Sequence, residues 1–235
     1  MILRILSLLL AAAMLAGCSQ SGAGSQLSPS PTEPSLLPPL PGTYAALGAS
    51  ETYGVGAVPH TNGYAYRLSS LLGATHFVDA GVPGTTIDAA YQGELTSALN
   101  ARPSLCTVFF GVNDLRAGVT RQSFLLDLHD LVATLREARC RVLIVGLPDV
   151  SKLPAVTRQH ISGVGSVVQS WNSGMSTIAR QTHSRFLNLQ PYGNEMASHP
   201  GLIASDGLHP SNSGHARLAQ IVLNAVRSWH MWAGK

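Results

Sequence analysis

The chain is organised around one turn, Ala46-Leu-Gly-Ala-Ser50-Glu-Thr-Tyr-Gly-Val-Gly56, which begins inside a short apolar run over residues 44–47. The apolar run predicts a strand, and the small residues after it let the backbone turn sharply. A sharp turn leaves the hydroxyl of Ser50 exposed at the carboxyl end of the strand. A serine in this position is a candidate nucleophile, which needs a base, a group that orients the base, and donors for an oxyanion.

From Thr43 onward, short apolar runs alternate with longer amphipathic runs, a pattern that predicts a parallel sheet flanked by helices. Strands are predicted over residues 44–47, 76–79, 105–110, 141–145 and 185–189. Helices are predicted over residues 62–72, 87–99 with a break near Gly93, 122–138, 167–182, and from a cap at Ser211 or Asn212 to about Trp229. Residues 148–165 are predicted to form a long loop. Open parallel sheets bind ligands beyond the carboxyl ends of their strands, so reactive residues are expected after the first three strands and before the last helix.

Two loops at this edge carry candidate donors for an oxyanion. Gly84, in Val-Pro-Gly84-Thr, can present a bare backbone N–H, or it can simply serve a type II turn, which needs glycine at its third position. Asn113, in Gly-Val-Asn113-Asp114, can hold its amide as a fixed donor at the tip of a buried strand. Alternatively, the Asn-Asp pair merely turns the chain or caps the next helix. Asp114 is expected to tie the loop down rather than to take part in chemistry.

The segment Ser205-Asp206-Gly-Leu-His209-Pro210 carries a candidate base and its orienting group. Its glycine and proline exclude a regular helix and predict a rigid loop that aims both side chains one way. In that loop His209 would take the proton of Ser50 and return it to the leaving group, while Asp206 would fix the imidazole tautomer. The alternative is a helix-capping loop in which Asp206 is only a turn residue.

Four blocks in chain order resemble the motifs of the SGNH (GDSL-type) esterase and lipase family: Gly-Ala-Ser50, Gly84, Gly-Val-Asn113-Asp114 and Asp206-Gly-Leu-His209-Pro. The resemblance covers about residues 43–229. It implies that Ser50 is the nucleophile, that His209 and Asp206 complete the triad, and that the oxyanion hole is formed by the Ser50 N–H, the Gly84 N–H and the Asn113 amide. It also implies a three-layer α/β/α sandwich with a flavodoxin-like, mainly five-stranded parallel sheet.

The sequence departs from the family at Ala49, which stands where the family's Gly-Asp-Ser has its aspartate. That aspartate is not a triad member, so the nucleophile is intact. Its loss removes a hydrogen-bonding group beside Ser50. We expect the change to affect the rate and the rigidity of the turn rather than the class of reaction.

The composition, 45% hydrophobic and only 11% charged, favours one globular domain with a substantial core. The net charge is +3 and the basic residues are scattered along the sequence, which argues against a nucleic-acid partner. The cysteines and the other histidines have no shared metal-ligand spacing, so neither a metal nor a cofactor is expected. Cys106 and Cys140 each open a predicted strand. Two buried free thiols are expected ahead of a disulfide, which an oxidising compartment would permit.

Residues 1–17 are predicted to be a signal peptide, because Arg4 precedes an apolar run over residues 5–15 that is too short to span a bilayer. Leu15-Ala-Gly-Cys18 resembles the bacterial lipoprotein cleavage box. This resemblance implies a lipidated Cys18 and an anchored, extracytoplasmic protein of the bacterial cell envelope; a plain secretory signal is the alternative. Residues 18–42 are rich in Ser, Gly and Pro and are predicted to be a disordered tether, followed by the domain over residues 43–235.

The expected function is a serine esterase that hydrolyses carboxylic esters through an acyl-enzyme. One alternative is an acyltransferase that passes the acyl group to an alcohol, such as a glycan hydroxyl, and another is a non-catalytic binding lipoprotein. The expected substrate is a small-molecule, glycan or lipid ester. Residues 148–165 and 191–204 are expected to wall the pocket, but their mixed composition does not name an acyl chain. Membrane contact is expected through the lipid anchor only, and the sequence does not indicate an oligomeric state.

Overall fold

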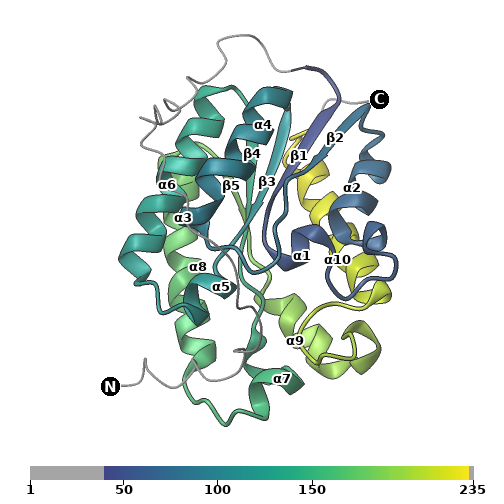
Figure 1. Ribbon diagram of the computed structural model, residues 1–235, viewed down its shortest axis with the longest axis vertical. Coiled ribbons are helices and arrows are strands. Elements are labelled where there is room, and N and C mark those ends of the chain that lie inside the picture. The colour runs from purple at the N-terminus through teal and green to yellow at the C-terminus, as the bar shows by residue number, and fades with distance from the viewer. Residues whose placement is uncertain (1–39, 233–235) are drawn as a thin grey trace, which may run out of the picture. The chain divides into compact units, whose positions relative to one another are not determined.

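The computed structural model describes residues 40–232, and its centre is a five-stranded, fully parallel sheet (Figure 1). The strand order is β2 (His76–Asp79), β1 (Thr43–Gly48), β3 (Leu105–Phe109), β4 (Arg141–Val145) and β5 (Arg185–Leu187). Every residue of β1 and β3 is buried, as in a parallel sheet covered on both faces. The predicted strands are confirmed, with ends that differ by no more than a few residues.

Helices cover both faces of the sheet and complete the three-layer α/β/α sandwich that the sequence led us to expect. Figure 1 shows one layer of helices, α3 (Ile87–Ala90), α4 (Thr96–Ala101), α6 (Arg121–Glu137) and α8 (Val164–Gln181), on one side of the strands. On the other side lie α2 (Tyr64–Leu72) and α10 (Asn212–Ser228). Each layer has its own apolar core. The first includes Leu47, Val108, Phe124, Leu128, Trp171 and Met175, and the second Tyr44, Leu105, Tyr64, Leu68, Leu218 and Val222.

Short helices gather at the carboxyl ends of the strands. They are α1 (Ser50–Tyr53), α5 (Val112–Arg116), α7 (Pro154–Thr157) and α9 (Gln190–Ser198), with 3-10 turns at His60–Asn62, Val150–Lys152 and Pro200–Leu202. The sequence pattern did not predict α9, because its apolar residues are few and it contains both Pro191 and Gly193. The proline is tolerated because it lies in the first turn of the helix.

Two predicted segments need adjustment. The segment from Ile87 is interrupted near Gly93, as expected, and the interruption is a π-turn, Tyr91–Leu95, between α3 and α4. The predicted loop over residues 148–165 contains a 3-10 turn and the short α7, and α8 begins at Val164 rather than at residue 167. Gly163, in the left-handed conformation with φ 79°, stands at the N-cap of α8 and starts the helix early.

The expectation of two free thiols is wrong, because Cys106 and Cys140 form a disulfide. Cys106 lies in β3 and Cys140 directly precedes β4, and these strands are neighbours with Leu105 opposite Arg141. The two cysteine Cα atoms are therefore only 6.2 Å apart. Since the sequence alone does not establish which strands are neighbours, it could not decide between thiols and a bridge.

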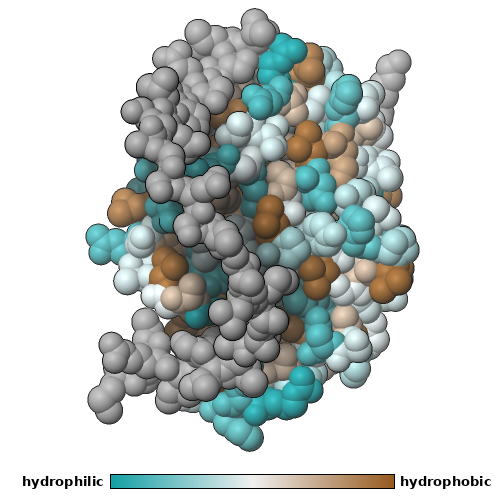
Figure 2. Space-filling model, in the orientation of Figure 1, coloured by the Kyte–Doolittle hydropathy of each residue, from teal (hydrophilic) through white to brown (hydrophobic). Residues whose placement is uncertain are grey.

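The surface of the described residues has exposed large apolar side chains only at separate positions, among them Tyr53, Val58 and Val82. On the part of the face in Figure 2 that is not drawn in grey, apolar residues are interspersed with polar ones. Among residues 40–232, no helix combines the length and the apolar character needed to cross a membrane. The predicted signal peptide, Cys18 with its predicted lipidation, and most of the predicted tether lie outside the described residues.

Candidate active site

The candidate site lies where the sheet changes direction of winding. In the strand order β2-β1-β3-β4-β5, the chain leaves β1 towards β2 at one edge of the sheet and leaves β3 towards β4 and the other edge. The loops after β1 and β3 therefore diverge, and such a switch point opens a crevice at the carboxyl ends of these two strands. Ser50 follows β1 and Asn113 follows β3, and the strands are in register up to Gly48 opposite Phe109. The Ala49 N–H then donates to the Phe109 carbonyl at 3.4 Å, so the two loops start side by side.

The turn that carries Ser50 requires a glycine before it. Gly48 has φ 155°, and a Cβ at this position would collide with the Thr52 hydroxyl and lie 2.6 Å from the Phe109 carbonyl oxygen. Ser50 begins α1, and its carbonyl accepts from Gly54 N–H at 3.0 Å and from Val55 N–H at 2.8 Å. The sharp turn predicted from the small residues is confirmed.

A buried carboxyl group, missed by the sequence analysis, holds this turn from below. Glu94 is 3% exposed, and its Oε2 accepts the Gly48 N–H at 2.7 Å, whereas its Oε1 has no partner among the described residues. Burial raises the pKa of Glu94 to about 8; the Gly48 N–H opposes this shift and the charge of Asp79 adds to it. Glu94 is therefore mostly protonated at neutral pH.

Glu94 anchors the residue next to Ala49, the position at which the sequence departs from the family's Gly-Asp-Ser. Ala49 is 5% exposed and has no polar side chain, and the adjacent Gly48 is tied to the π-turn through Glu94. The two residues are 46 positions apart, and nothing in the local sequence pattern links them. Only the break near Gly93 signalled that this helix was irregular, and π-turns often occur at functional sites.

The two candidate oxyanion donors lie on loops that are joined to each other. Asn113 Nδ2 donates to the Thr85 carbonyl at 3.0 Å, and the Val82 N–H donates to the Gly48 carbonyl at 3.0 Å. The Thr85 N–H donates to Val82 at 3.2 Å, and Gly84 has φ 85°, so a type II turn explains the glycine. A Cβ on Gly84 would meet no protein atom within 4 Å, so the backbone angle, not packing, requires glycine here.

Asp114 ties the Asn113 loop down, as expected. Its side chain is fully buried and its Oδ1 accepts the Ile87 N–H at 3.0 Å. Burial raises the pKa of Asp114, against the effect of the backbone N–H groups around it. The contact connects α5 to the start of α3, so both donor loops are attached to the same side of the sheet.

Asp206 and His209 are brought together by their loop. His209 Nδ1 lies 2.6 Å from Asp206 Oδ2, and Asp206 Oδ1 accepts the backbone N–H groups of Leu208 and His209 at 2.8 and 3.0 Å. Burial alone would raise the pKa of Asp206, but the hydrogen bonds from the His209 ring and from the two backbone N–H groups hold it below its usual value. An ionised Asp206 accepts from Nδ1–H, which leaves Nε2 of neutral His209 as a proton acceptor.

The loop after Ser50 packs directly against the histidine. Gly56 has φ 94°, and a Cβ there would lie 3.1 Å from the His209 Cβ and would collide with the Pro210 carbonyl. The Ser50 hydroxyl donates to Glu51 Oε2 at 3.1 Å, and no hydrogen bond joins it to His209 within residues 40–232. The structure thus joins Asp206 to His209 and brings the Ser50 loop against them, with the hydroxyl turned to its neighbour.

His215 fixes the position of the same loop from α10. Its Nδ1 accepts the Tyr64 N–H at 3.1 Å, so Nε2 carries the proton and donates to the Val55 carbonyl at 2.9 Å. Burial lowers the pKa of His215 and keeps it neutral, although the Val55 carbonyl opposes this shift. These two contacts give His215 a structural role in holding the loop. The part of the chain that the structure describes contains no cluster of three or more metal-binding side chains.

The protein is a three-layer α/β/α sandwich with a candidate nucleophile at its switch point, and comparison with known proteins assigns its family. Residues 46–217 match the GDSL-like Lipase/Acylhydrolase family, and the chain belongs to it. An acetylxylan esterase of Geobacillus stearothermophilus is 25% identical over 193 residues, covering 76% of this chain and 84% of that protein. The chain is an esterase that acts on ester bonds.

Solved structures share the fold at lower identity. An alpha/beta hydrolase enzyme from the metagenome of Lake Arreo, Spain, has a TM-score of 0.66 at 17% identity and covers 79% of this chain and 94% of its own. TesA has a TM-score of 0.66 at 17% identity, with 79% and 98% covered. A catalytic mutant of the Geobacillus stearothermophilus acetylxylan esterase has a TM-score of 0.63 at 19% identity, with 78% and 93% covered.

Proposed function

We propose that the protein hydrolyses carboxylic esters through an acyl-enzyme formed on Ser50. Ser50 Oγ attacks the ester carbonyl while His209 Nε2 takes the hydroxyl proton, and the imidazolium then protonates the departing alcohol. Water then attacks the acyl carbonyl while giving a proton to His209, and the imidazolium returns this proton to Ser50 Oγ as the bond to the acyl group breaks and the acid leaves. The observation that carries the proposal is the 2.6 Å contact of Asp206 with His209 Nδ1, which leaves Nε2 free for this proton.

Three N–H donors are assigned to the oxyanion. Among the described residues, neither the Ser50 N–H nor the Gly84 N–H donates a hydrogen bond, so both remain open to a ligand. Asn113 Nδ2 uses one hydrogen for the Thr85 carbonyl and keeps the second. Donors already fixed in place stabilise the tetrahedral anion without reorganisation when charge develops.

The described state is a resting arrangement of the nucleophile. The Ser50 hydroxyl donates to Glu51, so a rotation about the Ser50 side chain must precede proton transfer to His209. A rotation between staggered side-chain positions is fast on the timescale of turnover. Glu51 therefore holds the hydroxyl in competition with the base.

We assign short acyl esters of carbohydrates as the substrate class, supported by the similarity to the acetylxylan esterase. Nitrophenyl esters of increasing acyl length, measured beside acetylated xylo-oligosaccharides, test this assignment. Highest kcat/KM with acetyl groups is the expected result. A kcat/KM that rises steadily with the length of the acyl chain would refute this assignment and indicate lipid esters as the substrates.

Covalent labelling tests the nucleophile. A fluorophosphonate probe is expected to label the chain at Ser50, and the Ser50→Ala variant should take up no label and lose esterase activity. Labelling at another residue would refute the assignment, and an unlabelled but correctly folded protein would favour a binding role. Product analysis with added alcohols separates the hydrolase from an acyltransferase, since only the latter forms the new ester in preference to the free acid.

We also propose a location for the enzyme from its amino-terminal residues. A lipid on Cys18 would anchor the enzyme outside the cytoplasm of a bacterial cell, and residues 19–42 would act as the tether. Metabolic labelling with a fatty acid is expected to mark the protein in a bacterial host. The Cys18→Ser variant should lose the label and appear in the soluble fraction; a lipid that persists on this variant would contradict the assignment.

A further inference from the structure

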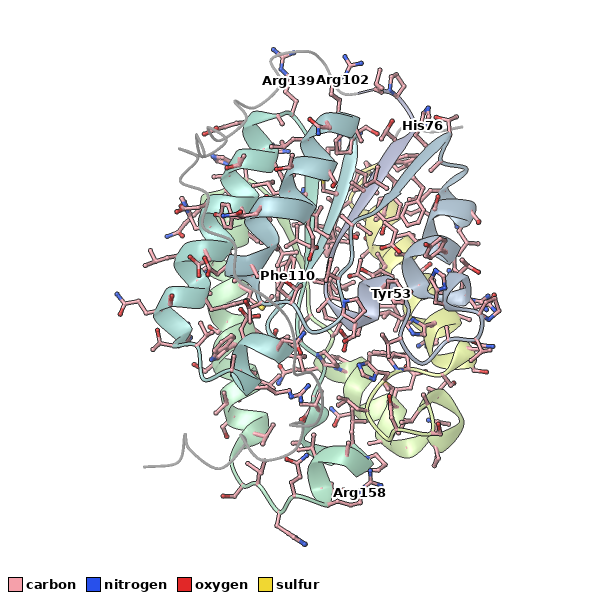
Figure 3. The ribbon with its side chains drawn as sticks, viewed as in Figure 1. Tyr53, His76, Arg102, Phe110, Arg139 and Arg158 are labelled. Atoms are coloured by element: carbon pink, nitrogen blue, oxygen red, sulfur yellow. A yellow bond between two sulfur atoms is a disulfide. The ribbon has the colours of Figure 1, made fainter. Side chains whose placement is uncertain are left out.

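Arginines collect at the amino ends of the strands, opposite the candidate active site. Figure 3 shows Tyr53 near α1 at the carboxyl end, and Arg102, Arg139 and His76 at the other end. At this amino end, a hollow of about 140 Å³ is lined by Arg136, Arg141, Arg185, His183, His230 and Trp229, together with small and apolar neighbours. None of the described residues that line it carries a carboxylate.

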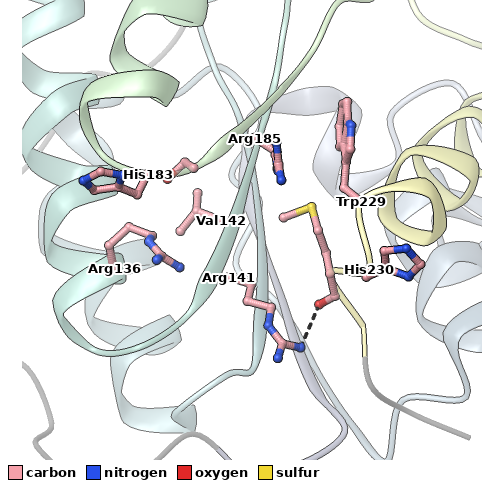
Figure 4. A pocket seen from close by; sticks show the side chains of 9 residues that line it. Arg136, Arg141, Val142, His183, Arg185, Trp229 and His230 are labelled. Atoms are coloured by element: carbon pink, nitrogen blue, oxygen red, sulfur yellow. Dashed lines mark hydrogen bonds between the residues drawn. The ribbon is translucent and has the colours of Figure 1, made fainter.

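The guanidinium groups that border this hollow (the arginine hollow) come from three elements. Arg136 belongs to the last turn of α6, and Arg141 and Arg185 begin β4 and β5 (Figure 4). In Figure 4 the three groups border one space, while the rings of His183 and His230 lie to its outer sides. The Arg185 guanidinium lies 6.0 Å from the centroid of the Trp229 ring, which restricts its position.

The donors of these arginines are largely unused by the protein. The Arg185 side chain makes no hydrogen bond to residues 40–232, and none of the three guanidinium groups is paired with a carboxylate in that part of the chain. Arg136 gives one hydrogen bond to the Cys140 carbonyl at 2.9 Å, but its Nε is buried without a described partner. Arg141 gives one to the Met231 carbonyl at 3.3 Å. A buried, unpaired charged donor is costly unless a ligand satisfies it.

Helix stabilisation explains only part of this arrangement. Basic residues in the last turn of a helix interact favourably with the helix dipole, which accounts for Arg136 and also for Arg180 and Arg227 elsewhere at this end. It does not account for Arg141 and Arg185, which begin strands. Arg141 and Arg185 are exposed, so solvent weakens the repulsion among these charges, but no carboxylate of the described residues pairs with them and a bound anion would.

We propose that the arginine hollow binds a phosphate group, either free or on the headgroup of an anionic lipid. The fork of a guanidinium matches two phosphate oxygens, and several forks around one hollow suit a tetrahedral anion. The hollow is smaller than the 300–1,000 Å³ of ordinary small-molecule pockets, so it takes one such group rather than a large ligand. This proposal is independent of the ester chemistry.

The position of the hollow favours the lipid source. The described chain begins at Leu40, whose N–H donates to the Arg102 carbonyl at 2.8 Å, so the tether enters the domain at this same end. If Cys18 carries a lipid, this end of the domain is the one from which the chain leads to the anchor. Basic clusters near an anionic lipid surface gain about 1 kcal/mol per residue from it.

Calorimetric titration of the full chain with inorganic phosphate tests the site. We expect saturable binding that Arg185→Gln and Arg141→Gln each weaken by roughly tenfold to a hundredfold, since each removes a charge-assisted contact. Arg180→Gln removes the same charge at the same end but lies outside the hollow, and should change the affinity less than about twofold. Equal losses in all three variants would show diffuse attraction and overturn the proposal. Esterase activity equal to that of the parent shows that each variant is folded.

Vesicle binding separates the two sources of phosphate. The full chain carrying Cys18→Ala, and the same chain with Arg185→Gln or Arg180→Gln, are mixed with phosphatidylcholine vesicles with and without phosphatidylglycerol. Greater binding to the anionic vesicles that is lost in Arg185→Gln and kept in Arg180→Gln identifies the headgroup. If the protein binds inorganic phosphate but does not prefer the anionic vesicles, the ligand is a soluble phosphate rather than a lipid headgroup. No dependence on Arg185 in either experiment overturns the proposal.

Discussion

Replacing Glu94 by glutamine isolates the effect of the buried carboxyl beneath the nucleophile turn. Glutamine keeps the shape and an oxygen that can accept the Gly48 N–H, but it cannot ionise. In the native protein burial raises the pKa of Glu94 to about 8. The perturbation therefore removes a titration while leaving the hydrogen bond that holds the turn.

The sign of the effect follows from proton binding. Between the ordinary carboxyl pKa of 4.5 and about 8, folded Glu94 holds a proton that the unfolded chain has lost. The folded state is therefore favoured at low pH, and the contribution of Glu94 to the free energy of unfolding falls as pH rises through this window by about 1.4 kcal/mol per pH unit. From pH 5.5 to 7.5 the native protein should lose roughly 3 kcal/mol relative to Glu94→Gln.

Denaturant unfolding followed by circular dichroism at pH 5.5, 6.5 and 7.5 measures this difference. Asp79 and Asp114, whose pKa values burial also raises, titrate in both proteins and largely cancel. Glu137→Gln, which neutralises an exposed carboxyl on α6, is the control and should follow the native protein at every pH. If native protein and Glu94→Gln respond to pH in parallel, the carboxyl does not carry the proton assigned to it and the reasoning fails.

The remaining predictions concern the site and the bridge. Asn113→Ala should lower kcat about a hundredfold or more with little change in KM, because it removes an oxyanion donor; an unchanged kcat would leave Asn113 only its contact to Thr85. Glu51→Ala should raise kcat/KM by up to about tenfold, since it frees the Ser50 hydroxyl, and a fall would give Glu51 a supporting role instead. The double variant Cys106→Ser and Cys140→Ser should lose about 3–4 kcal/mol of stability in chemical denaturation, as expected for opening a 34-residue span. A loss below about 1 kcal/mol would contradict this.

Features that depend on residues close together along the chain could be predicted from the sequence. Short apolar runs predicted the five strands and amphipathic runs predicted the main helices, because the spacing of apolar residues reflects which face of an element is buried. The same holds for Asp206 and His209, which are three positions apart. Gly207, with φ 78°, lets the chain turn between them so that their side chains form a hydrogen bond. Such contacts need no knowledge of the rest of the fold.

Contacts between residues that are distant in sequence could be identified only in the folded protein. The Gly48 bond to Glu94 spans 46 positions, and the disulfide depends on β3 and β4 being neighbours, which local patterns do not encode. The arginines that looked scattered in the sequence are gathered by topology. In a parallel α/β sheet the covering helices run opposite to the strands, so helix C-termini and strand starts meet at one end. The last turns of α6, α8 and α10 and the first residues of β4 and β5 all carry arginine, and the fold brings their charges together there.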